Sequence, residues 1–126
     1  MNISDSITPL NALSPLDGRY ASRAAALRPF LSEAGFMAHR VEVEVSWLIA
    51  LSQAGLNELP AFSADAENAL RSWVQDFSEA DAQRIKDIEK KTNHDVKAVE
   101  YWLKEKAANS STLPARRKIS IIRRTP

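Results

Sequence analysis

The 126-residue sequence has no cysteine, only three glycines and no apolar run long enough to cross a membrane. Without cysteine the chain forms no disulfide, offers no thiolate to a zinc ion and has no cysteine nucleophile. The N-terminal residues MNISDSITPL lack the basic and then apolar pattern of a secretory signal. We therefore expect a soluble, cytoplasmic protein that does not associate with membranes.

Acidic residues are missing from the C-terminal segment NSSTLPARRKISIIRRTP, which carries five of the 17 basic residues. Residues 1–108 consequently hold 12 basic and 16 acidic residues, so the main part of the chain is acidic. An acidic domain gives no reason to expect nucleic-acid binding. The tail itself has clustered charge, but it has no aromatic side chain on which a base could stack and no amphipathic pattern.

Helical patterns dominate the rest of the sequence, after an irregular lead-in over residues 1–20 that ends with SPLDGRY. Pro29 is predicted to separate a short helical piece from a long helix. The stretch VEVEV at residues 41–45 alternates like a strand, but its neighbours favour a helix because these residues share one helical face: Met37, Val41, Val45, Leu48 and Ser52. Beside that face lie Val43, Trp47 and Leu51, which predicts a helix packed on more than one side.

Three further helices are expected. Gly55 should end the long helix, and Ser63 should cap the next, whose apolar positions are Ala66, Leu70, Trp73, Val74 and Phe77. Ser78 and Asp81 form a capping-box pattern for a helix with the inner residues Ala82, Ile85 and Ile88. The last helix follows TNHD, with Val96, Val99, Trp102 and Leu103 facing inward. The sequence thus predicts an all-α domain over residues 21–108.

Two short stretches carry candidate chemistry. In TNHD, Asn93, His94 and Asp95 precede a helix whose free amides and dipole favour a bound anion, and Lys97 would add positive charge. The alternative is a helix cap made by Asn93 or Asp95, and the residues alone favour the cap.

In SPLDGRY, Arg19 and Tyr20 project from a loop, where an arginine can hold a carboxylate or phosphate, although most such arginines are simply solvated. His39 and Glu42 are spaced as a metal pair, but they lack a third ligand, so we predict no metal site.

Taken together, ALSPLDGRY, RVEVEVSWLIAL and TNHDVKAVEYWLKEK resemble, in order and spacing, the N-terminal domain of bacterial adenylosuccinate lyases, members of the aspartase/fumarase superfamily. The resemblance covers about residues 10–106. It implies the small helical N-terminal domain of that fold without its central helix bundle. It also implies an enzyme of purine biosynthesis that eliminates fumarate from adenylosuccinate and from a related carboxamide ribotide, without a metal or organic cofactor.

By the same resemblance, Arg19, Tyr20, Asn93, His94 and Asp95 are substrate-binding residues. Members of the family are homotetramers with active sites shared between subunits, and their acid–base histidine and catalytic serine lie in later regions that this chain does not have. The resemblance therefore implies no catalytic residue here and no lyase activity of the chain alone.

The family segment after the last helix reads approximately EFIHFACTSEDINN. Written with suitable synonymous codons and translated one base late, it gives residues 109–121 without a mismatch, and a family-like continuation gives residues 122–126 and a stop codon. We therefore interpret residues 109–126 as a disordered, out-of-frame tail and the chain as a lyase domain truncated by a frameshift near residue 108. Two alternatives remain: a helical interaction module whose basic tail binds nucleic acid or another partner, and a fragment that joins full-length lyase tetramers.

Overall fold

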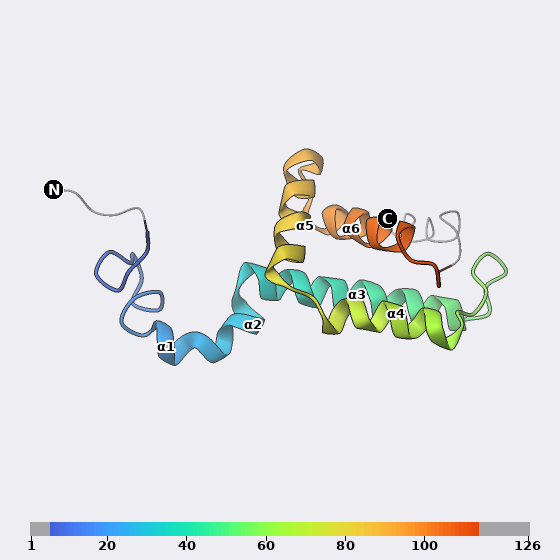
Figure 1. Ribbon diagram of the computed structural model, residues 1–126, viewed down its shortest axis with the longest axis horizontal. Coiled ribbons are helices and arrows are strands. Elements are labelled where there is room, and N and C mark those ends of the chain that lie inside the picture. The colour runs from blue at the N-terminus through green and yellow to red at the C-terminus, as the bar shows by residue number, and fades with distance from the viewer. Residues whose placement is uncertain (1–5, 114–126) are drawn as a thin grey trace.

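The long helices of the computed structural model, which describes residues 6–113, form a small bundle preceded by an extended arm (Figure 1). The arm consists of turns over residues 6–20 and three short pieces, α1 (Ala21–Ala24), the 3-10 helix η1 (Ala25–Leu27) and α2 (Arg28–Leu31). The bundle contains α3 (Glu33–Gln53), α4 (Ala64–Gln75), α5 (Glu79–Thr92) and α6 (Asp95–Ala108). Residues 6–113 contain no strand, so the predicted all-α fold is confirmed.

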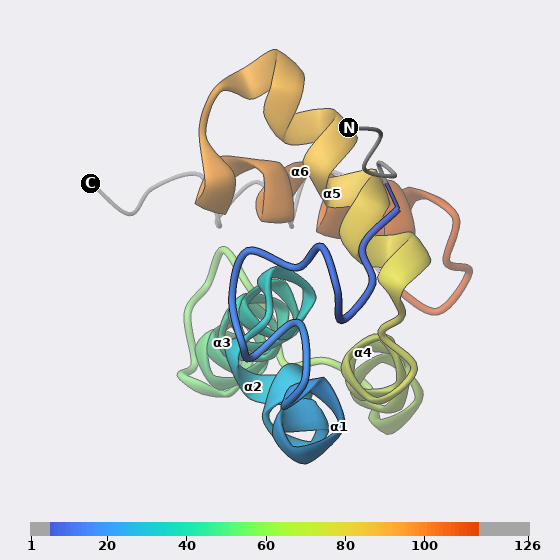
Figure 2. The same ribbon diagram turned by 90° about the vertical axis from the view of Figure 1, so that its left-hand side faces the viewer.

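Helix α3 is the element on which the other long helices assemble. It contacts α4, α5 and α6, and α5 and α6 also pack against each other. Figures 1 and 2 show α4 running alongside α3, with α5 and α6 together on one side of that pair. The VEVEV stretch lies within α3 as predicted, and these residues of the helix are buried: Gly35, Met37, Val41, Val45, Leu48, Ile49 and Ser52.

Local sequence signals set the ends of the helices. The Oγ atom of Ser63 accepts a hydrogen bond from the amide of Ala66 at 3.2 Å, which confirms the predicted cap of α4. Ser78 and Asp81 make the predicted capping box at the start of α5. Gly55, after the end of α3, has φ of +74°, a conformation that glycine adopts without steric cost.

The core lies between α3 and the three helices around it. Most inward positions predicted from the sequence are buried, and Trp102 packs edge to face on Phe77 with ring centroids 5.6 Å apart. Val96 is an exception, because 40% of it is exposed. It lies in the first turn of α6, where side chains lean back toward the N-terminal end of the helix.

The joint between α2 and α3 differs from its prediction. Pro29 lies in the first turn of α2, where proline is tolerated, and the break falls instead at Ser32, whose backbone is extended with ψ of 164°. The Oγ atom of Ser32 accepts from the amide of Gly35 at 3.1 Å and so caps α3. A Cβ atom on Gly35 would lie 2.5 Å from the carbonyl oxygen of Pro29, so this close approach requires glycine.

The arm contributes no residue to the buried core. Its large apolar side chains are exposed, among them Ile7, Leu10, Leu13, Leu16, Leu27, Phe30 and Leu31. At the other end, Leu113 is 8% exposed and joins the core after α6, whereas the basic part of the predicted tail lies outside the described residues. No helix in residues 6–113 is both long and apolar enough to cross a membrane.

Candidate functional site

The turn between α5 and α6 places Asn93, His94 and Asp95 at the start of a helix. Asn93 ends α5 with φ of 50°, and no other residue except Gly55 has a positive φ in residues 6–113. Asparagine tolerates this left-handed conformation better than most residues do. The reversal of the chain at Asn93 exposes the imidazole of His94 beside the first amides of α6.

His94, rather than Asn93 or Asp95, is the residue that caps α6. Its Nδ1 atom accepts a hydrogen bond from the amide of Lys97 at 3.2 Å, and its carbonyl oxygen accepts from the hydroxyl of Thr92. Because Nδ1 accepts, the neutral imidazole carries its proton on Nε2. The side chain is 63% exposed, so Nε2–H is presented as a donor next to the positive end of the helix dipole. Histidine is an uncommon cap, which explains why the sequence did not indicate this role.

Asp95 is held as a carboxylate by its surroundings. The Val96 amide donates to its Oδ1 atom at 2.8 Å and lowers its pKa most strongly, while desolvation acts in the opposite direction. Arg40 of α3 lowers the pKa further through an ion pair in which Nη2 lies 2.8 Å from Oδ2. The pKa of Asp95 therefore lies below its usual range, and the residue supplies a fixed negative charge beside His94.

Arg40 was not identified from the sequence as part of this site. It lies on α3, far from TNHD along the chain, and only the packing of α6 against α3 brings its guanidinium to Asp95. An ion pair of this kind leaves no local pattern in the sequence.

Arg19 and Tyr20 lie in the middle of the arm, directly before α1. The amide of Tyr20 donates to the carbonyl oxygen of Pro15 at 2.9 Å, which closes the SPLDGRY turn. The Arg19 guanidinium carbon lies 4.8 Å from the centre of the Tyr20 ring, so the cation stacks on the phenol. Tyr20 is 41% exposed and Arg19 is exposed as well, so both side chains are accessible to a ligand.

The two groups of candidate binding residues lie apart in residues 6–113 (Figure 1). In Figure 1 the arm and the turn between α5 and α6 occupy different parts of the molecule, and no hydrogen bond, ion pair or ring contact among residues 6–113 joins them.

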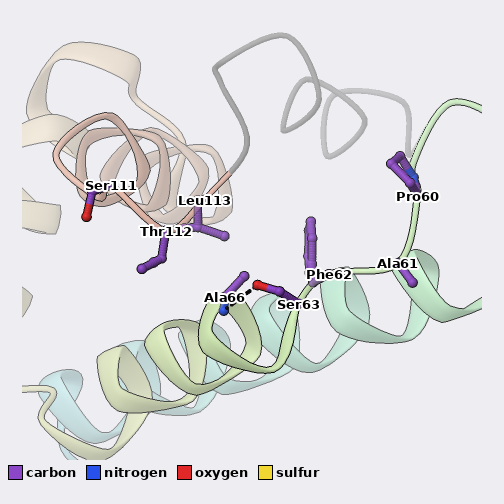
Figure 3. Close-up of a pocket in the computed structure, with 8 residues that line it drawn as sticks. All are labelled: Pro60, Ala61, Phe62, Ser63, Ala66, Ser111, Thr112 and Leu113. Carbon is purple, nitrogen blue, oxygen red and sulfur yellow. Dashed lines mark hydrogen bonds between the residues drawn. The ribbon is translucent and has the colours of Figure 1, made fainter.

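A pocket of about 390 Å³ lies elsewhere, between the start of α4 and the segment after α6 (Figure 3). Its lining carries no charge and consists of Pro60, Ala61, Phe62, Ser63, Ala66, Ser111, Thr112 and Leu113. The hydroxyl of Ser63 is already engaged in capping α4, as the dashed line in Figure 3 shows. A site for an anionic substrate requires fixed positive charge, so we do not assign it here.

No protein-family profile matches the chain, but individual curated proteins do. It is 54% identical over 110 residues to the adenylosuccinate lyase of Escherichia coli, a match that covers 86% of this chain and 24% of that protein. It is 55% identical over 108 residues to the adenylosuccinate lyase of Haemophilus influenzae and 46% identical over 101 residues to that of Dictyostelium discoideum. These matches cover 85% and 77% of this chain, and 24% and 21% of the relatives.

The chain therefore spans about a quarter of the length of the relatives that it matches. The matched part is the N-terminal quarter of those enzymes. Together with the all-helical fold, these identities show that the chain belongs to the adenylosuccinate lyase family and corresponds to the N-terminal quarter of its members.

Proposed function

We propose that this chain supplies the substrate-binding N-terminal part of an adenylosuccinate lyase. In this proposal Arg19, Tyr20, Asn93, His94 and Asp95 bind adenylosuccinate or the related succinyl carboxamide ribotide, from which fumarate is eliminated. The observation that carries the proposal is the geometry of His94, whose Nδ1 atom is engaged in capping α6 so that Nε2–H is offered to an anion. Both substrates carry carboxylates and a phosphate, which suit such a donor and the guanidinium of Arg19.

The elimination needs a base to remove a proton from the succinyl portion and an acid to protonate the departing nitrogen. We propose that both groups, together with the other binding residues, belong to the lyase regions beyond the matched quarter and that a cytoplasmic homotetramer is the working assembly. The chain by itself is then inactive. The purified polypeptide should release no fumarate from adenylosuccinate under conditions in which the Escherichia coli relative turns over, and fumarate release would contradict this expectation.

A chimera tests the binding role directly. Residues 1–108 of this chain would replace the matched quarter of the Escherichia coli relative, and the chimera should be an active lyase. His94→Ala should lower its kcat/KM by about 100-fold, because a donor to a charged group is lost. The chain has one other histidine, so His39→Ala is a matched control that should retain activity. Equal activity of the two variants would refute the binding role of His94.

We also propose that residues 109–126 are read out of frame. The nucleotide sequence of the gene tests this proposal. Translated in the other reading frame, the sequence downstream of codon 108 should encode the next part of an adenylosuccinate lyase, and any other translation refutes the proposal. The alternative function is an interaction module whose basic tail binds nucleic acid. It would be favoured by a nucleic-acid affinity that falls steeply with salt and disappears when residues 109–126 are deleted.

A further inference from the structure

Helix α6 differs from the other long helices in the atom that caps it. A serine hydroxyl accepts the capping hydrogen bond at the start of α3, α4 and α5, from Ser32, Ser63 and Ser78. At the start of α6 the acceptor is the Nδ1 atom of His94, which accepts from the amide of Lys97. A hydroxyl keeps its acceptor lone pairs near neutral pH, but an imidazole nitrogen loses its lone pair when it is protonated. The cap of α6 is therefore the only one of these four that a proton can remove.

A second group lies close to the same nitrogen. The Oδ1 atom of Asp95 is 3.7 Å from Nδ1 of His94, slightly beyond hydrogen-bonding distance. Asp95 is fixed from two sides, because the Val96 amide donates to Oδ1 at 2.8 Å and the Arg40 guanidinium lies 2.8 Å from Oδ2. A carboxylate oxygen can accept a second hydrogen bond, so Oδ1 can also serve another donor. Nδ1 thus lies between a donor, the Lys97 amide, and an acceptor, the Asp95 carboxylate.

Each protonation state of the ring suits only one of these two contacts. The neutral ring, with its proton on Nε2, accepts from Lys97 and has no proton on Nδ1 to offer Asp95. The imidazolium carries a proton on Nδ1, so it can donate to the carboxylate but cannot accept from the amide. The 63% exposed side chain has room to turn, while the Thr92 hydroxyl donates to the carbonyl oxygen of His94 and holds its backbone.

We propose that protonation of His94 transfers its Nδ1 atom from the Lys97 amide to the Asp95 carboxylate, which removes the cap of α6. The TNHD turn then has two states, one with a capped helix and a neutral histidine, the other with an uncapped helix and a histidine–aspartate ion pair. Only the side chain of His94 has to move, because the carboxylate is already held by Val96 and Arg40.

Charged residues reach this turn from each element that meets there: Lys90 and Lys91 end α5, Arg40 lies on α3, and Asp95 and Lys97 begin α6. Most of these cations have a carboxylate partner: Lys90 pairs with Asp87, Lys97 with Glu100 and Arg40 with Asp95. Asp95 lies against the imidazole itself, and its lowered pKa keeps it ionised where imidazoles titrate. Arg40 neutralises part of that charge and opposes protonation, as does the positive end of the α6 dipole. The balance between Asp95 and Arg40 therefore sets the pH at which the switch operates.

The switch regulates the candidate binding turn. Nε2–H is present in both states, but only the imidazolium adds a positive charge to it. An anion bound at Nε2 stabilises the imidazolium, so binding of the anion and binding of the proton favour each other. This consequence rests on the proposed function, in which His94 contacts a carboxylate or phosphate of the substrate, whereas the switch itself does not.

NMR spectroscopy of the full chain labelled with ¹⁵N tests the proposal. In the neutral state a scalar coupling across the hydrogen bond should connect the amide nitrogen of Lys97 to Nδ1 of His94. As the pH is lowered, this coupling should vanish with the midpoint at which the ring takes up its second proton, and the Lys97 amide signal should move with it. A coupling that persists in the doubly protonated ring, or that is absent from the neutral ring, would overturn the proposal.

Substitutions beside the ring should move this midpoint in opposite directions. Asp95→Asn removes the anion that stabilises the imidazolium and should shift the midpoint to lower pH, whereas Arg40→Gln removes a cation and should shift it to higher pH. His94→Asn retains a good cap that does not titrate, so the Lys97 amide signal should become independent of pH in this range. His39→Ala, at the other histidine of the chain, is the matched control and should leave the midpoint unchanged. Shifts of the first two variants in the same direction, or a Lys97 signal that still follows pH in His94→Asn, would contradict the switch.

The switch and the proposed function can fail separately. If the coupling vanishes on protonation but His94→Ala leaves the kcat/KM of the chimera unchanged, the switch stands and the substrate-binding role of His94 is refuted. If His94→Ala lowers the kcat/KM of the chimera but the coupling survives protonation, the binding role stands and the switch is refuted.

Discussion

Arg40 of α3 holds Asp95 at the first position of α6 through an ion pair of 2.8 Å. Asp95 follows the histidine that caps the same helix, so the pair connects the candidate binding turn to the central helix of the bundle. The turn is thus oriented by a residue that does not belong to its own motif. This dependence can be measured without any enzymatic activity.

Replacing Arg40 by glutamine should raise the pKa of Asp95 toward its ordinary value, since one of the charges that lowers it is removed. The hydrogen bond from the Val96 amide remains, so the pKa should stay below that value. A lowered pKa stabilises the fold above the unfolded-state pKa, and this contribution is lost as the pH falls through the folded-state pKa. NMR titration of the carboxyl group measures the change. Arg71→Gln, on the exposed side of α4, is the control, and an unchanged pKa in the Arg40 variant would contradict the prediction.

Replacing Ser78 by alanine should destabilise the protein by about 0.5–2 kcal/mol, because the cap of α5 is lost. Desolvation raises the pKa of Asp81, but hydrogen bonds with Ser78 and Lys106 outweigh it, so the pKa lies below its usual value. Loss of the Ser78 hydroxyl removes one of these hydrogen bonds, so the pKa of Asp81 should rise in this variant. Urea unfolding at neutral pH gives the difference in free energy. Ser46→Ala, at an exposed position within α3, should change stability by less than about 0.5 kcal/mol. Equal effects of the two substitutions would refute the capping argument.

Glu44 on α3 has a raised pKa, first because of burial and second because Glu100 of α6 carries the same charge nearby. Its raised pKa means that stability is highest below the unfolded-state pKa and declines as the pH rises through the folded-state pKa. Glu44→Gln should therefore stabilise the protein at neutral pH, and the gain should vanish below about pH 4.5. Lys97 and Lys104 both pair with Glu100, so they moderate the effect. Thermal unfolding across pH tests this, and a gain that persists in acid would contradict it.

Truncating Leu70 of α4 to alanine should cost about 2–5 kcal/mol, because the side chain is 1% exposed and its loss leaves a cavity in the core. A loss of that size is a large part of the stability of a small domain. The matched control is Leu10→Ala in the arm, where the leucine is 99% exposed. Its stability should be unchanged, and comparable urea midpoints for the two variants would show that α4 does not close the core.

Features that depend on neighbouring residues were predictable from the sequence. The caps at Ser63 and Ser78 need only a hydroxyl and the amides that follow it, and the interpretation of VEVEV as helix needed only the spacing of residues on either side. Features that depend on packing were not predictable. The pairing of Arg40 with Asp95 and the exposure of Val96 both follow from where α6 lies on α3, which no local pattern specifies.

The side of α3 opposite the core illustrates the same limit in a different way. The apolar residues Val43, Trp47 and Leu51 predicted a helix that packs on more than one side, yet Val43 and Trp47 are 66% and 50% exposed in the part of the chain that the structure describes. The spacing of apolar residues thus indicates a helical face, but it does not specify what covers that face.

The close approach of Gly35 to Pro29 determines where the arm points. The direction in which Arg19 and Tyr20 are carried away from the bundle depends on a position where the side chain is a single hydrogen atom. A side chain at position 35 would clash with the backbone of Pro29 and force α2 to rotate relative to α3. Because the arm is long, a small rotation at this joint would displace its distant residues by a larger distance. A substitution at this joint would thus move two candidate ligand-binding residues that it never touches.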